Sequence, residues 1–101
     1  MARSPNELDA IEALAAMASG RLSAEALTRA CLDRIAARDS VVLAFAHLDP
    51  ERALAEARSR DRAREAGSAG RLNGLPIGVK DIIDTHDMPT SCGSPIHAGH
   101  R

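Results

Sequence analysis

The chain has 101 residues, which is enough for one compact domain and leaves no room for a second. Its net charge of −1 argues against proteins that bind nucleic acid or anionic membranes, because both classes need a clear excess of positive charge. Alanine accounts for 20 residues, nearly half of the 45% that is hydrophobic, and Phe45 is the only aromatic residue. We therefore expect a thin core, because a methyl group buries little area.

No segment has the pattern of a targeting or membrane-spanning sequence. Acidic residues interrupt the N-terminal region, which lacks the apolar run of a signal peptide. The apolar run over residues 41–46 is far too short to span a bilayer. The two cysteines, Cys31 and Cys92, do not fit a C-x-x-C spacing. We expect a soluble, cytoplasmic protein with reduced cysteines.

Two segments, residues 7–18 and 23–38, have the periodicity of amphipathic helices, with apolar residues at steps of three and four. A third helix is predicted over about residues 50–66, because Asp49, Pro50 and Glu51 supply a cap, a proline at the first helical position and an acidic first turn. Ser23 and Asp49 are the predicted N-caps of the second and third helices, because both side chains can accept a bond from a free backbone N–H.

Glycines mark two of the helix ends. Gly20 follows the first predicted helix, and Gly67 follows the third. Glycine commonly terminates helices because it adopts a left-handed backbone conformation without strain. We therefore predict that these two helices end just before the two glycines.

Two segments change the period: residues 41–46 are predicted as a buried strand or extended segment, and residues 75–80 as a strand. Residues 41–46 read V-V-L-A-F-A, a short continuous apolar run typical of a buried strand. A second run covers residues 75–80 and ends at Lys80. The predicted fold class is α/β, with a helical part over residues 1–66 and a strand and loop segment over 72–101.

Lys80 is the strongest candidate for a functional side chain. It is the only lysine, and the other twelve residues of the Lys and Arg total are arginines. A desolvated lysine can lose its proton near neutral pH and act as a base, whereas an arginine keeps its charge. Burial among its apolar neighbours would favour the neutral amine. These neighbours are Ile77, Val79, Ile82 and Ile83. The alternative is a structural lysine that pairs with Asp81 or Asp84.

The segment around Lys80 carries several spaced motifs. They are G-L-P-I-G-V-K-D at residues 74–81, D-T at 84–85, P-T at 89–90 and G-S-P at 93–95. In this order they resemble the N-terminal part of the amidase signature family, whose members begin with alanine-rich helices. The resemblance implies one large amidase-type domain with helices around a mixed sheet. Residues 1–101 would be its N-terminal part and would contribute its first strands.

The resemblance also implies a Ser–Ser–Lys hydrolase. In that family the lysine at the position of Lys80 is the base, which takes a proton through a bridging serine and activates a second serine as nucleophile. The implied reaction is hydrolysis of the C–N bond of a small-molecule carboxamide, without a cofactor or a metal. Two narrower functions stay open, the A subunit of a glutamyl-tRNA amidotransferase and an allophanate hydrolase. A homo-oligomer also stays open.

The sequence departs from the family at the serines. The family's bridging and nucleophilic serines lie well downstream of the lysine, in a stretch rich in glycine and serine. No two serines are adjacent in this chain, and Ser91 and Ser94 lie too close to Lys80 to match. We therefore expect an amidase fragment that is inactive by itself. A hypothesis of another class is a non-catalytic remnant, whose residues 1–66 act as a helical interaction module.

Two further kinds of binding site are not favoured by the sequence. Cys92, His97 and His100 are candidate zinc ligands, but a structural zinc site needs a fourth ligand and their spacing fits no standard finger. Four arginines lie within residues 58–64, but acidic residues lie among and beside them and no aromatic side chain lies among them to stack on bases. We predict no metal site and no nucleic-acid contact from this segment.

Overall fold

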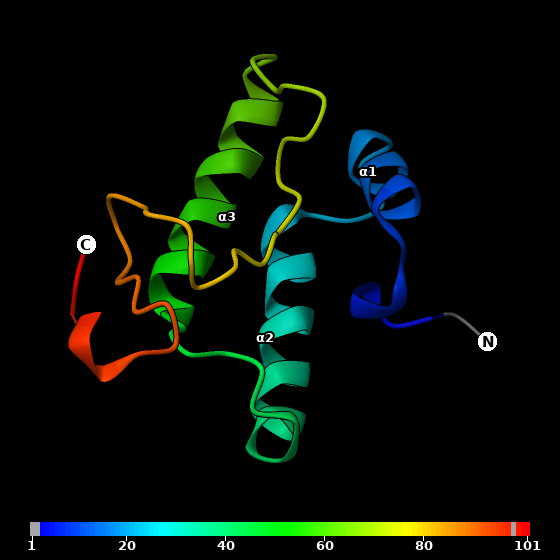
Figure 1. The fold of residues 1–101 in the computed structure, drawn as a ribbon. Helices are drawn as coiled ribbons and strands as arrows, with labels where there is room; N and C mark the ends of the chain where they lie inside the picture. Colours follow the sequence, from blue (N-terminus) through cyan, green and yellow to red (C-terminus); the bar gives the residue numbers. More distant parts are fainter. Residues whose placement is uncertain (1–2, 98) are drawn as a thin grey trace.

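The computed structural model describes residues 3–97 and 99–101, and the regular elements within them are helices (Figure 1). In chain order they are the 3-10 helix η1 (Pro5–Glu7), α1 (Ala10–Ala18), α2 (Ala24–Val42), α3 (Pro50–Glu65) and the 3-10 helix η2 (Pro95–His97). α2 and α3 lie side by side and run in opposite directions. After α3 the chain turns back across the helices and continues in loops, which η2 interrupts near the C-terminal end.

α1 begins with a reciprocal cap between Asp9 and Glu12. The backbone N–H of Glu12 donates to Asp9 Oδ1 over 2.8 Å, and the backbone N–H of Asp9 donates to Glu12 Oε1 over 3.0 Å. This cap makes Ala10 the first helical residue, later than predicted, and Glu7 lies in η1 instead. The predicted end is confirmed, because Gly20 follows the helix with a φ of +80°.

The other two helices begin where the sequence predicts. Ser23 Oγ accepts a hydrogen bond from the backbone N–H of Ala26 over 3.0 Å at the start of α2. Asp49 Oδ1 accepts one from the backbone N–H of Arg52 over 3.1 Å at the start of α3. Gly67, with a φ of +79°, follows the end of α3. These three predictions are confirmed.

The core lies where α1, α2 and α3 meet. Its buried apolar cluster consists of Ala13, Met17, Ala24, Leu27 and Ala57. Three of these five side chains are methyl groups, which allow close approach of the helices but bury little area. The thin core predicted from the alanine content is present.

A carboxylate of α3 caps the start of α2. Asp61 Oδ1 accepts a hydrogen bond from the backbone N–H of Ala24 over 2.7 Å, and Asp61 Oδ2 accepts one from Glu25 over 3.1 Å. These N–H groups have no partner within their own helix, and the helix dipole favours negative charge at this end. The contact links residues 37 positions apart, so no local pattern in the sequence indicates it.

Asp61→Ala should lower the free energy of unfolding by about 1–2 kcal/mol, because two helix N–H groups lose their acceptor. Urea unfolding followed by circular dichroism measures the change. Asp33→Ala is the matched control, because Asp33 is an exposed residue of α2 and the same substitution there removes no contact with α3. Equal unfolding midpoints for the two variants would show that the Asp61 cap contributes nothing.

The predicted α/β fold class is wrong for the described chain. Within residues 3–97 and 99–101 no β-strand forms. Of residues 41–46, the first two extend α2 to Val42 and the rest have no regular structure. The predicted strand over 75–80 also has no regular structure. A strand needs a partner for its backbone groups, and neither apolar run has one in this structure.

The end of α2 shows how the helix replaces the predicted strand. Leu43 has a left-handed backbone with a φ of +57°, and its N–H donates to the Asp39 carbonyl over 2.7 Å. The next N–H, of Ala44, donates to Asp39 Oδ1 over 2.8 Å. Continuation of the helix therefore satisfies backbone donors that an unpaired strand would leave to solvent.

Candidate functional site

The motif segment is anchored to the helices at its first residues. The side chain of Asn73 is buried, and its Nδ2 donates to the Arg60 carbonyl of α3 over 2.9 Å. Arg64 Nη2 donates to the Asn73 carbonyl over 3.0 Å. The side chain and the backbone of Asn73 are therefore both hydrogen-bonded to α3. The helices therefore set the path along which the chain approaches Lys80.

Gly74 packs directly against α1 and α2. A Cβ atom at this position would lie 2.9 Å from Ala24 Cβ and 3.1 Å from Met17 Sδ, which is closer than these atoms can approach without a shift. Its φ of +86° lies in the left-handed region, which favours glycine. The first glycine of the predicted motif thus has a structural role, because no other residue fits its backbone and its surroundings.

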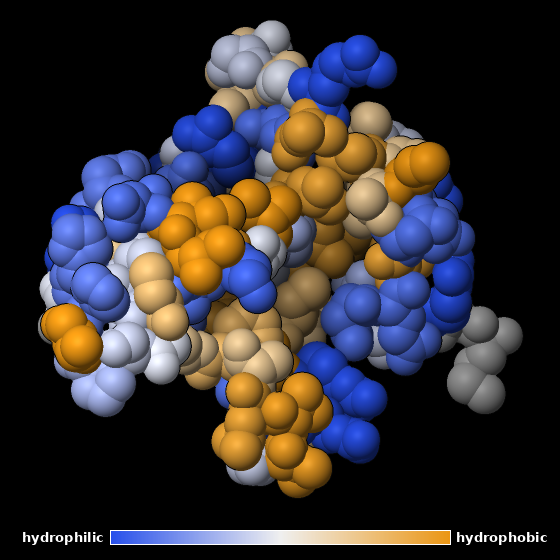
Figure 2. Space-filling model, viewed as in Figure 1, coloured by the Kyte–Doolittle hydropathy of each residue, from blue (hydrophilic) through white to orange (hydrophobic). Residues whose placement is uncertain are grey.

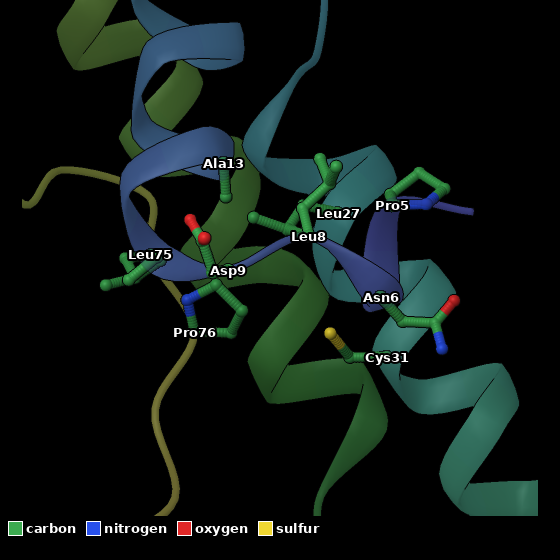
Figure 3. A pocket seen from close by; sticks show the side chains of 10 residues that line it. Pro5, Asn6, Leu8, Asp9, Ala13, Leu27, Cys31, Leu75 and Pro76 are labelled. Atoms are coloured by element: carbon green, nitrogen blue, oxygen red, sulfur yellow. The ribbon is translucent and has the colours of Figure 1, made fainter. Parts of the chain in front are cut away.

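The chain after Gly74 borders a small hollow of about 200 Å³. η1, α1, α2 and the chain at Leu75 and Pro76 line it (Figure 3). Cys31 of α2 also lines the hollow, where burial raises the pKa of its thiol and so disfavours the reactive thiolate. Lys80 is not among the lining residues, so the hollow is separate from the candidate catalytic residue.

Lys80 lies on an exposed part of the chain. The apolar residues predicted to enclose it are exposed as well. Ile77 and Val79 are 78% and 40% exposed, and Ile82 and Ile83 are 61% and 51% exposed. The described residues therefore do not supply the apolar surroundings that a neutral lysine requires.

Exposed apolar side chains also occur away from Lys80. Figure 2 shows hydrophobic surface in the middle of one face and at its lower end, where α2 ends in Figure 1. The exposed residues at this end of α2 include Val41, Val42 and Leu43. Apolar surface of this extent usually marks a contact with another part of a protein or with a partner.

The structure does not show the alternative in which Lys80 pairs with a neighbouring carboxylate. Asp84 Oδ1 instead lies 3.2 Å from His100 Nε2. The Asp81 carboxylate binds Ser91 and Gly93. Within residues 3–97 and 99–101, Lys80 forms no ion pair with either aspartate and no side-chain hydrogen bond to a serine.

Asp81 joins the Lys80 segment to a turn further along the chain. Its Oδ1 accepts from the Ser91 N–H over 2.8 Å, and its Oδ2 accepts from the Ser91 hydroxyl over 2.5 Å and from the Gly93 N–H over 3.4 Å. The Cys92 N–H donates to the Asp81 carbonyl over 2.9 Å. The hydroxyl bond, followed by the Ser91 N–H bond, lowers the pKa of the Asp81 carboxyl below its ordinary value.

A second contact is made by Thr90, the residue that directly precedes the turn at residues 91–93. The buried Thr90 hydroxyl donates to the Ile83 carbonyl over 2.7 Å, and the Ile83 N–H donates to the Lys80 carbonyl over 3.1 Å. The Thr90 N–H donates to the His100 carbonyl over 2.6 Å. The turn from Lys80 to Ile83 is therefore attached at both ends to the segment that begins at Thr90. The sequence places these residues in separate motifs and does not indicate that they meet.

The remaining candidate residues do not gather into a site. Cys92, His97 and His100 are exposed. In the part of the chain that the structure describes, no three His, Cys, Asp or Glu side chains are placed to hold a metal ion. Among the same residues, no helix is both long and apolar enough to cross a membrane.

Comparison with known proteins identifies the family. The family model described as Amidase matches residues 26–101. Curated proteins named as A subunits of glutamyl-tRNA(Gln) amidotransferase are similar to this chain, among them those of Chloroflexus aggregans (52% identical over 87 residues), Chloroflexus aurantiacus (47% over 97) and Streptomyces coelicolor (48% over 94).

The matches are long relative to this chain and short relative to the curated proteins. They cover 85%, 95% and 92% of this chain, but 18%, 20% and 19% of the three relatives in the same order. The chain thus spans about one fifth of the length of the curated relatives it matches. No solved structure gives a significant match. Because the family model matches most of the sequence, including the Lys80 motifs, the chain belongs to the amidase family.

Proposed function

We propose that this chain is the N-terminal region of an amidase that hydrolyses a carboxamide C–N bond with Lys80 as the base. The observation that carries the proposal is the single lysine of the chain, which lies in the G-L-P-I-G-V-K-D motif within the matched region. The anchoring of Asn73 and Gly74 to the helices supports it, because a base needs a defined position relative to its substrate.

In the proposed mechanism the neutral amine of Lys80 accepts a proton from a bridging serine. That serine takes the proton of a second serine, whose oxygen attacks the amide carbonyl and forms an acyl-enzyme. The leaving nitrogen takes up a proton as the C–N bond breaks, and water then hydrolyses the ester. Both serines belong to the family's relay and would come from outside this chain, which has no adjacent pair of serines.

The exposure of the Lys80 segment is consistent with a site that is completed by other parts of the enzyme. A lysine acts as a base only when it is neutral for part of the time, and burial among apolar groups favours that state. Ile77 and Ile82 supply apolar groups but are exposed. In the complete enzyme we expect further chain to cover them and to enclose Lys80. The curated relatives, about five times longer than the matched region, have the necessary length.

The relatives favour one branch of the family. Those named above are A subunits of glutamyl-tRNA(Gln) amidotransferases, and their identity to this chain is 47–52%. The more specific proposal is therefore an amidotransferase component that hydrolyses an amide and passes the ammonia to an acceptor. No feature of the described chain favours an allophanate hydrolase.

The charge distribution on α3 argues against a nucleic-acid partner for this region. Arg58 Nε lies 3.0 Å from Glu25 Oε2, and Arg60 Nε lies 3.5 Å from Glu56 Oε1. These arginines face carboxylates and do not form a continuous basic surface. We propose that this segment makes no nucleic-acid contact. We also propose a reducing, cytoplasmic setting, which suits the free thiols of Cys31 and Cys92.

A chimera tests the proposal on this sequence directly. In it, this chain replaces the aligned region of the Chloroflexus aurantiacus relative, with which it is 47% identical over 97 residues. We expect the chimera to release ammonia from a carboxamide such as glutamine, and to release less from simple aliphatic amides or allophanate. Replacement by the same chain with Lys80→Ala is the control. A folded chimera without activity on any amide would favour the non-catalytic remnant.

The 101-residue chain by itself is expected to show no amide hydrolysis. A base without a serine nucleophile and without donors for the developing oxyanion supplies neither attack nor charge stabilisation. Ammonia release from a panel of amides, compared with buffer and with the Lys80→Ala chain, measures this. Turnover above buffer that depends on Lys80 would show that the chain contains a complete site.

A further inference from the structure

The residue after Lys80 is fixed by four hydrogen bonds from one turn. Three end on the Asp81 carboxylate, from the Ser91 N–H, the Ser91 hydroxyl and the Gly93 N–H. The fourth runs from the Cys92 N–H to the Asp81 carbonyl. Side chain and backbone of Asp81 therefore bind the same three-residue turn, which limits rotation of the chain on the C-terminal side of Lys80.

The turn has a conformation that needs such a partner. Cys92 and Gly93 both have a left-handed backbone, with φ values of +53° and +70°. This conformation costs free energy at a non-glycine residue such as Cys92. It also lets the N–H groups of Ser91 and Gly93 converge on one anion, as backbone nests do. The Asp81 carboxylate is that anion, and its bonds offset the strain at Cys92.

We propose that Asp81 is a positioning residue for Lys80, because its carboxylate binds the Ser91–Gly93 turn and so fixes the backbone from which the lysine side chain extends. The inference rests on the proposed function, since the position of Lys80 matters for rate only if Lys80 is the base. Asp81 acts through the backbone, and the structure does not show it paired with the amine. Thr90, bound to the Ile83 carbonyl, secures the other end of the Lys80–Ile83 turn.

The ionisation of Asp81 sets the pH range in which the turn is held. The pKa of Asp81 in the folded state lies below the ordinary pKa of an aspartate. The carboxylate therefore stabilises the folded state at pH values above that ordinary pKa. The contribution is lost as pH falls through the lowered pKa of the folded state. The hydrogen bonds between the Asp81 carboxylate and the turn are therefore fully formed at neutral pH.

The contacts are tested in the 101-residue chain by NMR during an acid titration. The Ser91 and Gly93 amide signals should shift together, with one midpoint below the ordinary aspartate pKa, and Asp81→Asn should abolish this shift. Asp84→Asn is the matched control, because Asp84 faces His100 and should leave the shift intact. The Ala26 amide, bound to the Ser23 hydroxyl, should stay constant and so excludes general unfolding. Amides that titrate identically in Asp81→Asn would overturn the proposal.

The positioning role is tested by kinetics of the chimera. Asp81→Asn should lower kcat about 10–100-fold with little change in KM, because misplacement of a reacting group by about 1 Å costs rate on the order of 100-fold. Ser91→Ala, which removes only the hydroxyl bond, should have a smaller effect, and Ser91→Thr should restore the rate. A normal kcat in folded Asp81→Asn would overturn the proposal.

The two experiments separate this inference from the proposed function. An inactive chimera whose chain still shows the Asp81-dependent shifts would refute the amidase proposal and, with it, the need for positioning. If the chimera is active but the Ser91 and Gly93 amide signals do not depend on Asp81, the positioning role of Asp81 is refuted and the amidase proposal stands. Amide shifts that depend on Asp81, together with a kcat that falls in Asp81→Asn, falls less in Ser91→Ala and stays normal in Ser91→Thr, support both.

Discussion

Lys80→Arg in the chimera is expected to abolish amide hydrolysis while the protein stays folded. Arginine keeps the positive charge and nearly the reach of lysine, so it would preserve activity if Lys80 only formed an ion pair. It cannot act as a base, because a guanidinium does not release its proton in proteins. The steady rate of ammonia release is the measurement, and circular dichroism establishes that the variant is folded.

Lys80→Ala provides the comparison. It removes the base and should lower kcat by about 10²–10⁴-fold, the usual range for loss of a general base. We expect the arginine and alanine variants to be equally impaired. Near-normal activity in folded Lys80→Arg would show that the charge matters and the proton transfer does not. In that case the catalytic assignment of Lys80 would be wrong, although the family assignment would stand.

The features that the sequence predicted correctly are those with local causes. Ser23 and Asp49 each cap a helix through a backbone group three residues away, so their effect is visible in a short window of sequence. Gly67 ends α3 for a similarly local reason. The amidase motifs, with Lys80 among them, are also read from consecutive residues.

The features that the sequence missed depend on partners far along the chain. The strand pattern of residues 41–46 describes a preference that is realised only when another strand supplies hydrogen bonds, and here the first part continues α2 instead. Asp61 caps a helix that begins 37 residues earlier. The sequence offers Asp81 as a partner of Lys80, yet the Asp81 carboxylate binds Ser91. A pattern of residue types does not show which of several acceptors a donor will meet in space.

The sequence therefore predicts a chemistry for the candidate site but not its geometry. It proposes Lys80 as the base, which stays a prediction, and the structure adds the contacts that direct the chain to Lys80 and fix the chain after it. Asn73 and Gly74 attach the preceding segment to the helices, and Asp81 attaches the following residue to the Ser91–Gly93 turn. Lys80 thus lies between two anchored points, and its own side chain is exposed.

Gly74→Ala is expected to destabilise the 101-residue chain by about 2–5 kcal/mol. One part of the cost is the left-handed backbone, which costs a non-glycine residue about 1–2 kcal/mol. The other part is the added methyl group, which would lie 2.9 Å from Ala24 Cβ in the core and force the helices to shift, at about 1–3 kcal/mol. Urea unfolding followed by circular dichroism gives the total.

Two other glycines of the chain separate these contributions. Gly67 has a φ of +79° but nothing within 4 Å of an added Cβ, so Gly67→Ala should show the backbone cost alone. At Gly70 an added Cβ also has open space, and no left-handed φ applies, so Gly70→Ala should be neutral or stabilising by up to about 1 kcal/mol. The unfolding midpoints should therefore fall in the order Gly70→Ala, Gly67→Ala, Gly74→Ala. If Gly74→Ala and Gly67→Ala are equally stable, the contact with Ala24 is absent in solution, and the motif segment is not docked on the helices where the structure places it.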